Sequence, residues 1–359
     1  MTALLEVSDL VVDFPTSSDG VFHAVDRVSF TVSAGERVGI VGESGSGKSL
    51  TSQALMRLVP SPGTVSQGTV LFEGEDVMSF SPKKLQTWRG SQTAMVFQDP
   101  MSSLNPLMRI GRQITESLQV HLGLSKAESR TRAIELLQKV GIPDAESRLS
   151  DFPGAFSGGM RQRVCIAIAT ACSPKLLIAD EPTTALDVTV QAQVLDLLDN
   201  MASELNTGVI LISHDLGVIS SFCDRILVMY AGRIVEQGTA EQIVGDPQHP
   251  YTKALLASIL KLGEPIPRRL RSISGAPPTA GHRPAGCSFA ARCASVIDTC
   301  LTIDPALVPA ENTRPTNATA TSAIPTNATS AFAGTPEQLV ACGVAAPAAF
   351  AISEGATAA

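Results

Sequence analysis

The chain has 359 residues, of which 44% are hydrophobic and 17% charged, and its formal net charge at pH 7 is −7. This length is enough for one large domain or two smaller ones with a buried core. The acidic balance argues against non-specific nucleic-acid binding as the main role, because proteins with that role usually carry a basic face. No apolar run of the core approaches the ~20 residues of a membrane span, and the acidic first stretch does not resemble a signal peptide.

The first segments predict strands. Residues 4–14 alternate loosely between apolar and polar side chains, and residues 24–32 form a second strand pattern after a turn cluster. Phe14 and Phe22 are candidates for stacking on an adenine ring, although ordinary packing is the commoner role of such side chains. The apolar run 38–41 predicts a third strand.

A phosphate-loop pattern, GxxxxGK[ST], follows that strand and opens a predicted helix. Its residues are Gly42, Glu43, Ser44, Gly45, Ser46, Gly47, Lys48 and Ser49. The glycines let backbone N–H groups converge on phosphate oxygens, and the helix N-terminus adds partial positive charge. Lys48 is expected to reach the β- and γ-phosphates, and the Ser49 hydroxyl to bind Mg²⁺. The alternative is a plain glycine-rich turn, but the complete motif between strand and helix favours a site for ATP and Mg²⁺.

Two short strands are predicted over residues 68–72 and 93–97, and Gln98 follows the second one. Side chains just beyond a strand end often contact the ligand in α/β folds, so Gln98 could complete a Mg²⁺ or water site. Taken alone, this amide is more simply interpreted as a capping residue. Residues 104–142 predict helical structure with a break near Gly123, and their periodic apolar side chains are typical of a core.

A second anion site is predicted at Ser157, Gly158, Gly159 and Met160. Ser157 is a good helix N-cap, and the two glycines expose the first N–H groups of a helix that runs to about residue 171. One chain seldom needs two such sites for one phosphate. We therefore expect one of the two sites to serve the nucleotide of a neighbouring molecule.

Polar side chains follow two more apolar strands. Residues 175–179 lead to Asp180 and Glu181, and residues 209–212 lead towards His214. Asp180 fits the carboxylate that holds Mg²⁺ in phosphate-loop proteins, and Glu181 fits a general base for the attacking water. His214 alone would usually be structural, but its place among other polar strand ends favours contact with the γ-phosphate. A helix over 189–205 and a hairpin over 226–236 complete this part of the chain.

In this order the motifs resemble those of the ATP-binding subunits of ABC transporters, over about residues 4–260. The matching motifs are the phosphate loop, the glutamine loop at Gln98, the signature at 157–161, the strand 176–181, the aspartate loop 185–187 and the switch histidine His214. The signature reads Phe-Ser-Gly-Gly-Met where the general pattern is Leu-Ser-Gly-Gly-Gln. Stretches that are similar to the oligopeptide/dipeptide importer branch occur at 98–106, 179–189 and 247–252.

The resemblance implies an α/β fold of the P-loop NTPase class. An ABC-type nucleotide-binding domain with a mixed sheet would span residues 1–258, with a helical subdomain at about 104–171, and a small irregular extension would span 259–359. The resemblance also implies that ATP lies between the phosphate loop of one subunit and the signature of the other. Its implied residue roles are catalysis by Glu181, His214 and Gln98, and Mg²⁺ binding by Ser49, Gln98 and Asp180.

The implied partners are a second, often non-identical ATP-binding subunit, two transmembrane permease subunits and an extracytoplasmic solute-binding protein, with no nucleic acid. Such a chain would lie at the cytoplasmic face of the membrane, held there by the permeases. The solute would be a peptide, with nickel or another small solute as the alternative, because selectivity lies in other chains. A soluble ABC ATPase of DNA repair or translation is less favoured, because those proteins usually carry long coiled coils or two such domains.

Prolines break up the chain after residue 258, and Cys287, Cys293, Cys300 and Cys342 follow. From residue type and spacing alone, an iron–sulfur site, a zinc site and free thiols in a redox-sensing module all stay open. Residues 275–293 resemble the C-terminal extension of the peptide-importer branch, which implies a [4Fe–4S] cluster on these four cysteines. Here Gly343 follows the last cysteine, where the family usually has a histidine.

A low-complexity insert at about 305–334 separates Cys300 from Cys342 and predicts a flexible loop. The tail over 343–359 is expected to be disordered. The remaining cysteines lie in core-like segments and are expected to be buried small hydrophobic residues. They are Cys165, Cys172 and Cys223.

Overall fold

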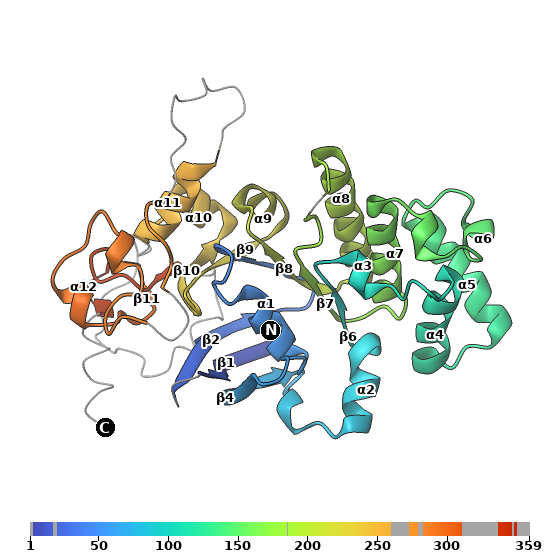
Figure 1. The fold of residues 1–359 in the computed structure, drawn as a ribbon, viewed down its shortest axis with the longest axis horizontal. Coiled ribbons are helices and arrows are strands. Elements are labelled where there is room, and N and C mark those ends of the chain that lie inside the picture. Colours follow the sequence, from blue (N-terminus) through green and yellow to red (C-terminus); the bar gives the residue numbers. More distant parts are fainter. Residues whose placement is uncertain are drawn as a thin grey trace, which may run out of the picture.

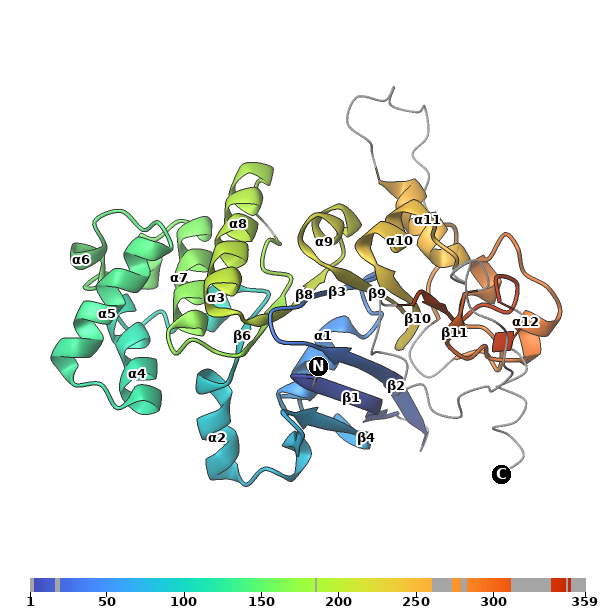
Figure 2. The ribbon, with the colours of Figure 1, turned by 180° about the vertical axis from the view of Figure 1, so that it is seen from behind.

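A computed structural model describes residues 3–16, 20–184, 186–259, 273–278, 283–310, 337–346 and 348–349. It has a small antiparallel sheet beside a larger mixed sheet, with a group of helices at one end and the C-terminal segments at the other (Figures 1 and 2). Among the described residues, none of the helices combines the length and the apolar character needed to cross a membrane.

The antiparallel sheet has the strand order β2-β1-β4-β5. Its strands are β1 (Leu5–Pro15), β2 (Val21–Val32), β4 (Thr64–Phe72) and β5 (Glu75–Asp76). The pairing of β1 with β4 shifts register between Ser8 and Val11. Gly68 has a φ of +94° there, and a Cβ atom on it would lie 2.6 Å from the Asp9 carbonyl oxygen. Only glycine therefore fits this irregularity in the sheet.

The mixed sheet has the strand order β11-β12-β10-β9-β3-β8-β7-β6. The strands β9, β3, β8, β7 and β6 run parallel to one another, whereas β10 pairs antiparallel with β9 and with β12, and β12 pairs antiparallel with β11. Their bounds are β3 (Arg37–Val41), β6 (Thr93–Val96), β7 (Leu176–Asp180), β8 (Gly208–Ser213), β9 (Arg225–Tyr230), β10 (Arg233–Thr239), β11 (Val308–Pro309) and β12 (Leu339–Val340). This mixed sheet with its helices confirms the expected fold class.

Alternate side chains of the parallel strands enter two different cores. Ile178 and Ile210 face the antiparallel sheet and pack with Leu5, while Leu177 and Leu211 face the helices on the other side. Every residue of β7, β8 and β9 is buried. Burial on both faces explains why these strands read as continuous apolar runs in the sequence.

Helices cover the mixed sheet and form the group at one end of it. Those near the sheet are α1 (Lys48–Leu55), α2 (Pro82–Ser91), α9 (Leu216–Phe222), α10 (Ala240–Gly245) and α11 (Pro250–Ser258). The group at the end contains α3 (Pro100–Ser103), α4 (Ile110–Leu122), α5 (Lys126–Lys139), α6 (Ala145–Arg148), α7 (Gly158–Thr170) and α8 (Val188–Leu205). The short helix α12 (Thr299–Thr302) and the 3₁₀ turns Val77–Ser79, Pro153–Ala155 and Ala290–Arg292 complete the described elements.

The expected helical stretch 104–142 is divided differently from the prediction. Residues 104–109 are not helical, because Asn105 accepts from the Leu107 N–H through its side chain and forms a turn. The break at Gly123 is confirmed, with a φ of +68°. The helix after it starts with a capping box between Ser125 and Glu128. The helix α2 was not predicted, although Ser81 followed by Pro82 is a typical helix start.

The C-terminal extension joins the mixed sheet through β12, which pairs with β10. Glu236 of β10 is fully buried beside it. Its carboxylate accepts hydrogen bonds from the backbone N–H groups of Gln248 (2.7 Å) and His249 (2.9 Å) and from the Gln338 side chain (2.8 Å). The extension was expected to be irregular, but it contributes two strands to the sheet. Most of the expected insert 305–334 and of the expected tail lies outside the described residues.

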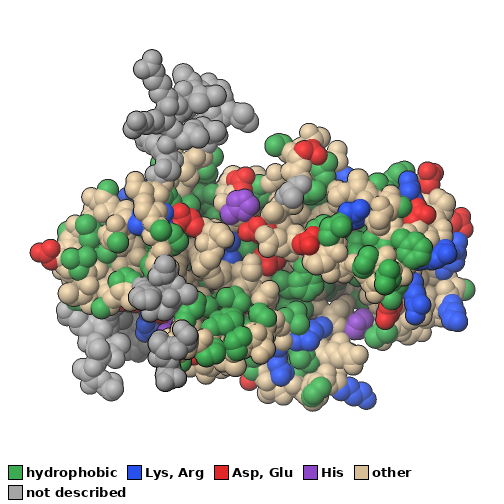
Figure 3. Space-filling model, viewed as in Figure 1, with side chains coloured by type: hydrophobic (Ala, Val, Ile, Leu, Met, Phe, Trp, Pro, Cys, Tyr) green, Lys and Arg blue, Asp and Glu red, His purple; other side chains and the backbone are tan. Residues whose placement is uncertain are grey.

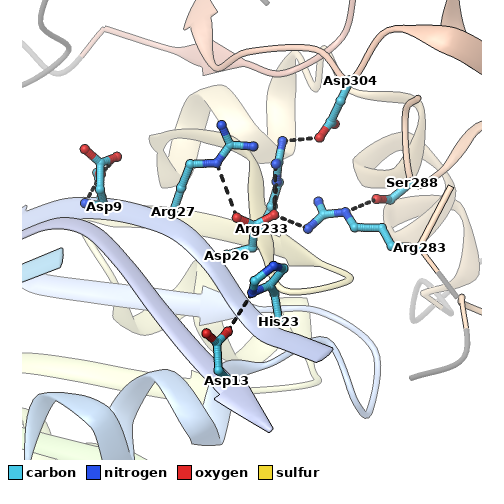
Figure 4. A network of polar contacts seen from close by, with 10 residues as sticks. Asp9, Asp13, His23, Asp26, Arg27, Arg233, Arg283, Ser288 and Asp304 are labelled. Atoms are coloured by element: carbon cyan, nitrogen blue, oxygen red, sulfur yellow. Dashed lines mark hydrogen bonds and ion pairs between the residues drawn. The ribbon is translucent and has the colours of Figure 1, made fainter. Parts of the chain in front are cut away.

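A second polar network ties the extension to β2 around Asp26 (Figure 4). The carboxylate pairs with Arg233 (2.8 Å), Arg27 (3.3 Å) and Arg283, and Arg233 also pairs with Asp304. Burial raises the pKa of the Asp26 carboxyl, but Arg233, Arg283 and Arg27 outweigh burial and hold it below its usual value. The carboxylate is therefore stabilised in its charged form in the folded protein.

We predict that Asp26→Asn lowers the free energy of unfolding at pH 7 by roughly 3 kcal/mol, because it removes a buried carboxylate and leaves the half-buried Arg233 and Arg283 without their partner. A carboxyl whose pKa is lowered on folding stabilises the protein above its unfolded pKa, and this contribution is lost as the pH falls through the folded value. The difference between wild type and variant should therefore shrink below about pH 4. Denaturant unfolding at several pH values measures it.

Glu75→Gln is the matched control for that variant. Glu75 pairs with Lys84 at 2.9 Å, but both side chains are about half exposed, at 63% and 47%. Such a surface pair contributes less than about 1 kcal/mol. The prediction would be contradicted if Asp26→Asn lowered the free energy of unfolding no more than Glu75→Gln does. It would also be contradicted if the effect of Asp26→Asn did not depend on pH.

Candidate functional site

The predicted phosphate loop lies between β3 and α1. Gly47 forms the N-cap of α1 with a φ of +102°. A Cβ atom on it would lie 2.7 Å from the Ala24 carbonyl oxygen. Strand and helix therefore meet at a turn that only glycine permits, and the N-terminus of α1 faces the loop, as anion binding requires.

Lys48 is buried and is tied to the loop itself. Its Nζ donates to the carbonyl oxygens of Gly42 (2.8 Å) and Glu43 (3.0 Å). Burial lowers the pKa of the Lys48 ammonium, and the nearby carboxylates of Glu181 and Asp180 partly oppose this shift. The lysine therefore lies between the loop and the carboxylates that end β7.

Ser49 and Asp180 form the next contact of the site. The Ser49 hydroxyl donates to Oδ1 of Asp180 at 3.0 Å, which joins the first residues of α1 to the end of β7. Burial raises the pKa of the Asp180 carboxyl, and the charge of Glu181 adds to this effect. These two oxygen-bearing side chains are the ligand types that Mg²⁺ prefers.

Three side chains converge on one oxygen of Glu181. Oε2 accepts from Nε2 of Gln98 (3.0 Å) and the hydroxyl of Thr184 (2.9 Å), and it lies 3.3 Å from Nδ1 of His214. Glu181 itself has a φ of +47°, which is uncommon outside glycine and is typical of functional sites. The structure thus brings Gln98, Glu181 and His214 together, as their positions at parallel strand ends predict.

Thr184 is a site residue that was not predicted. It lies three residues after Glu181, in the turn that follows Pro182, and its backbone N–H donates to the Glu181 carbonyl oxygen at 3.1 Å. A hydroxyl at that place in a tight turn was the available signal.

The predicted signature lies at the start of α7, apart from α1 (Figure 1). The Ser157 hydroxyl accepts from the Met160 N–H at 3.3 Å, and Ser157 and Gly158 are exposed. In the described part of the chain, no hydrogen bond connects residues 157–160 with the phosphate loop. Asp187 of the aspartate loop caps α8 through the Val190 N–H, and Ala185 lies outside the described residues.

The two candidate aromatic residues face each other. Phe14 of β1 and Phe22 of β2 are direct cross-strand partners. The backbone of His23 and Ala24, which follow Phe22, lies against Gly232, and Ala24 also lies against Gly47. Stacking of Phe14 or Phe22 on adenine stays a prediction.

Cys287, Cys293, Cys300 and Cys342 all line one small cavity, together with His249 and Phe289. Cys300 and Cys342 are buried and the other two are half-buried. Burial raises the pKa of the Cys287 thiol to about 11. In the residues that the structure describes, however, no three His, Cys, Asp or Glu side chains are arranged so that they could hold a metal ion.

The other three cysteines are buried, as expected. Burial raises the pKa of the Cys165 thiol to about 12, and it also raises the pKa values of Cys172 and Cys223. Thiols in this environment remain protonated and unreactive at neutral pH.

Two family models match the chain. The model described as "ABC transporter" matches residues 25–184, and "Oligopeptide/dipeptide transporter, C-terminal region" matches residues 235–300. Among solved structures, the chain is similar to the dimeric ATP-binding cassette MJ0796 bound to ADP and Pi, with 26% identity, a TM-score of 0.60 and coverage of 66% of this chain and 98% of that one. It is also similar to cbiO1 from Clostridium perfringens, with 27% identity, a TM-score of 0.59 and coverage of 68% and 92%.

Curated relatives are more similar still. The oligopeptide transport ATP-binding protein OppD of Bacillus subtilis is 53% identical over 293 residues, which are 81% of this chain and 82% of that protein. AppD of the same organism is 49% identical and covers 86% and 94%, and OppD of Salmonella typhimurium is 49% identical and covers 83% and 88%. Identity of this degree over 81–86% of the chain shows that it belongs to the family of ABC-transporter ATP-binding subunits of the oligopeptide type.

Proposed function

We propose that this chain is the ATP-hydrolysing subunit of a peptide importer. The observation that carries the proposal is the convergence of Gln98, Thr184 and His214 on the Glu181 carboxylate, beside a phosphate loop. The names of its relatives as oligopeptide transport proteins support a peptide as the solute. Nickel or another small solute is the alternative, because the selectivity of such importers would lie in their other chains.

Residues 42–49 would bind the phosphates of ATP. The loop presents its N–H groups at the N-terminus of α1, and the Lys48 ammonium would move from the loop carbonyls to the β- and γ-phosphates. The donor set of the neighbouring strand end fits Mg²⁺. Ser49 and Asp180 would hold it, with the amide oxygen of Gln98 as a further ligand, and the ion would neutralise charge on the transferred phosphoryl group.

Glu181 would act as the general base. Among the described residues, the three hydrogen-bond partners of its side chain all reach Oε2, which leaves Oε1 to accept a proton from the attacking water. Gln98, Thr184 and His214 orient the carboxylate, and His214, whose side chain is 60% exposed, can also contact the γ-phosphate. Hydrolysis of the γ-phosphate bond is thus assigned to residues at three neighbouring strand ends.

The signature Ser157–Met160 would serve the ATP of a second, non-identical ATP-binding subunit. The exposed N-terminus of α7 supports this assignment, because it is open to a partner and, among the residues described by the structure, forms no hydrogen bond with the phosphate loop of its own chain. The two subunits would pair head to tail and close on two ATP molecules. Closure would drive two permease subunits, to which an extracytoplasmic protein delivers the solute.

The helical group would dock on the permeases, which would hold the chain at the cytoplasmic face of the membrane. Lys and Arg side chains gather at this end of the molecule (Figure 3). A groove there is lined by Arg109, Arg112, Lys126 and Arg130, and Leu107 nearby is 88% exposed. A basic and partly apolar surface of this kind is typical of an interaction site.

We predict that Glu181→Gln lowers ATP hydrolysis and ATP-driven uptake by about 10²–10⁴-fold in the reconstituted transporter, because the amide cannot take a proton from water. Binding of Mg·ATP should be retained, since the substitution removes a negative charge near the phosphates. Rates of hydrolysis and uptake in proteoliposomes measure the first effect, and equilibrium binding measures the second.

Glu204→Gln is the control for that experiment. Glu204 is an exposed residue of α8 that pairs with Lys139, and its replacement should leave both rates unchanged. ATP-driven uptake that persists in the Glu181→Gln transporter would refute the assignment of the base.

The four cysteines of the extension would hold a [4Fe–4S] cluster. The donor types fit, because four thiols line one small cavity together with Phe289 and His249. Since no three of them are arranged to hold a metal ion in this structure, cluster binding would require the surrounding segments to shift. Cys287, Cys293, Cys300 and Cys342 would hold the cluster through their sulfur atoms, and this binding would stabilise the extension. Zinc and free thiols remain the alternatives.

We predict that protein purified without oxygen contains about four iron and four sulfide per chain. The variant Cys300→Ser should lose most of both, because one buried ligand is removed. Cys165→Ser, which changes a buried cysteine of α7 outside the cavity, should retain them. Metal analysis measures the iron content, and visible absorbance spectra detect the cluster. Zinc in place of iron, or no metal in the wild type, would refute the cluster.

A further inference from the structure

A side chain of the extension contacts the phosphate loop directly. The Arg292 guanidinium forms a two-pronged ion pair with the Glu43 carboxylate, with Nη1 2.6 Å from Oε2 and Nη2 3.0 Å from Oε1. The Arg292 side chain is only 4% exposed. Bidentate pairs of this kind are among the strongest and most directional contacts of an arginine.

The surroundings of Arg292 fix the guanidinium in place. Its Nε donates to the Ser274 carbonyl oxygen at 2.9 Å, and Nη1 also donates to the Tyr230 hydroxyl at 3.3 Å. The guanidinium carbon lies 5.8 Å from the centre of the Tyr230 ring and 5.9 Å from that of Phe289. An arginine held this way is preorganised, so little side-chain entropy is lost when it pairs with Glu43.

Glu43 is held through its backbone as well. Its N–H donates to the buried Tyr251 hydroxyl at 2.8 Å, and its carbonyl oxygen accepts from Lys48 at 3.0 Å. The first half of the phosphate loop is therefore fixed from α11, from the extension and from the loop lysine. A loop fixed before ATP arrives loses less entropy on binding.

The charge of Glu43 gives Arg292 a second effect. A carboxylate within a phosphate-binding loop repels the nucleotide unless it is neutralised, because both carry negative charge at short range. Arg292 supplies that neutralisation. It is the side chain that forms a bidentate pair with Glu43 among the residues that the structure describes.

We propose that Arg292 is a positioning residue for ATP: from the C-terminal extension it fixes and neutralises Glu43, so that the phosphate loop is ready to bind nucleotide. This inference rests on the proposed ATP binding at residues 42–49. Arg292 ends the turn Ala290–Arg292, which lies between Cys287 and Cys293. A fixed conformation of residues 287–293 should therefore increase the affinity for ATP. By the same coupling, bound ATP should stabilise that conformation.

The competing interpretation is that Arg292 merely fastens the extension to the body of the protein. Arg283 provides the matched comparison, because it also reaches from the extension to the body, where it pairs with Asp26. Within the extension it donates to Ser288. It makes no contact with the phosphate loop among the described residues. A purely mechanical role would give Arg292 and Arg283 the same effect on ATP.

The test compares Arg292→Gln with Arg283→Gln in the full chain and in the reconstituted transporter. Arg292→Gln should raise the Kd for Mg·ATP, and the KM for ATP, about 10-fold, which corresponds to about 1.4 kcal/mol. Its kcat should change less than about 2-fold, because Arg292 does not touch the reacting atoms. Arg283→Gln should lower the melting temperature and leave the Kd within 2-fold.

The double variant Glu43→Gln/Arg292→Gln separates charge from fastening. Removal of the unpaired carboxylate should restore much of the affinity that Arg292→Gln loses, a coupling that simple destabilisation cannot produce. If Arg292→Gln does not fold, Arg292→Lys keeps the charge without the two-pronged contact and should give an intermediate Kd. An unchanged Kd in Arg292→Gln or Arg292→Lys, an equal rise in Arg283→Gln, or no restoration in the double variant would overturn the proposal.

Two controls separate this proposal from the proposed function. Wild type should bind Mg·ATP, and Lys48→Ala should bind it far more weakly. If wild type does not bind Mg·ATP, the proposed function fails. If the wild type binds and Lys48→Ala does not, but Arg292→Gln binds like wild type, only the role of Arg292 fails.

Discussion

The parallel alignment of β3, β6, β7 and β8 is the constraint on which the rest of the structure depends. Strands that run in one direction end at one edge of the sheet, so polar residues far apart in the sequence meet there. The apolar strands are buried on both faces, which makes that edge rigid. Groups that are unfavourable to bury, such as the Lys48 ammonium and the Asp180 carboxylate, tolerate burial because each lies near the opposite charge.

The parallel strands, and the polar residues that follow them, could be predicted from the sequence. Buried parallel strands appear as unbroken apolar runs, and Gln98, Glu181 and His214 stand just after such runs. The arrangement of three donors around one oxygen of Glu181 could not be predicted, because it depends on the unusual backbone of that residue and on the turn that carries Thr184.

Contacts between distant segments left no local signal. Arg292 and Glu43 are separated by 249 positions, and nothing in the order of residues around either one points to the other. The strands β11 and β12 have only two residues each, too few for a periodic pattern. The helical prediction over 104–109 failed for another reason: the predicted helix began too early, at residue 104, where the side chain of Asn105 stabilises a turn.

In the part of the chain that the structure describes, the extension contacts the body at several separate places. It adds β12 to the edge of the sheet, sends Arg283 to Asp26 of β2, and places Arg292 on the phosphate loop. Each contact involves a different part of the nucleotide-binding body. The C-terminal segments are therefore packed into the nucleotide-binding body. A change in the conformation of these segments would affect the loop at which ATP would bind.

The pairing of β11 with β12 also brings two points of the chain together. Val308 lies opposite Val340, so the ends of the stretch between these strands are held side by side. The entropic free-energy cost of closing a flexible loop rises only with the logarithm of the loop's length, by about 0.6 kcal/mol for each doubling. The chain can therefore be lengthened between these two strands at little thermodynamic cost, which makes this position suited to a genetically inserted fluorescent reporter.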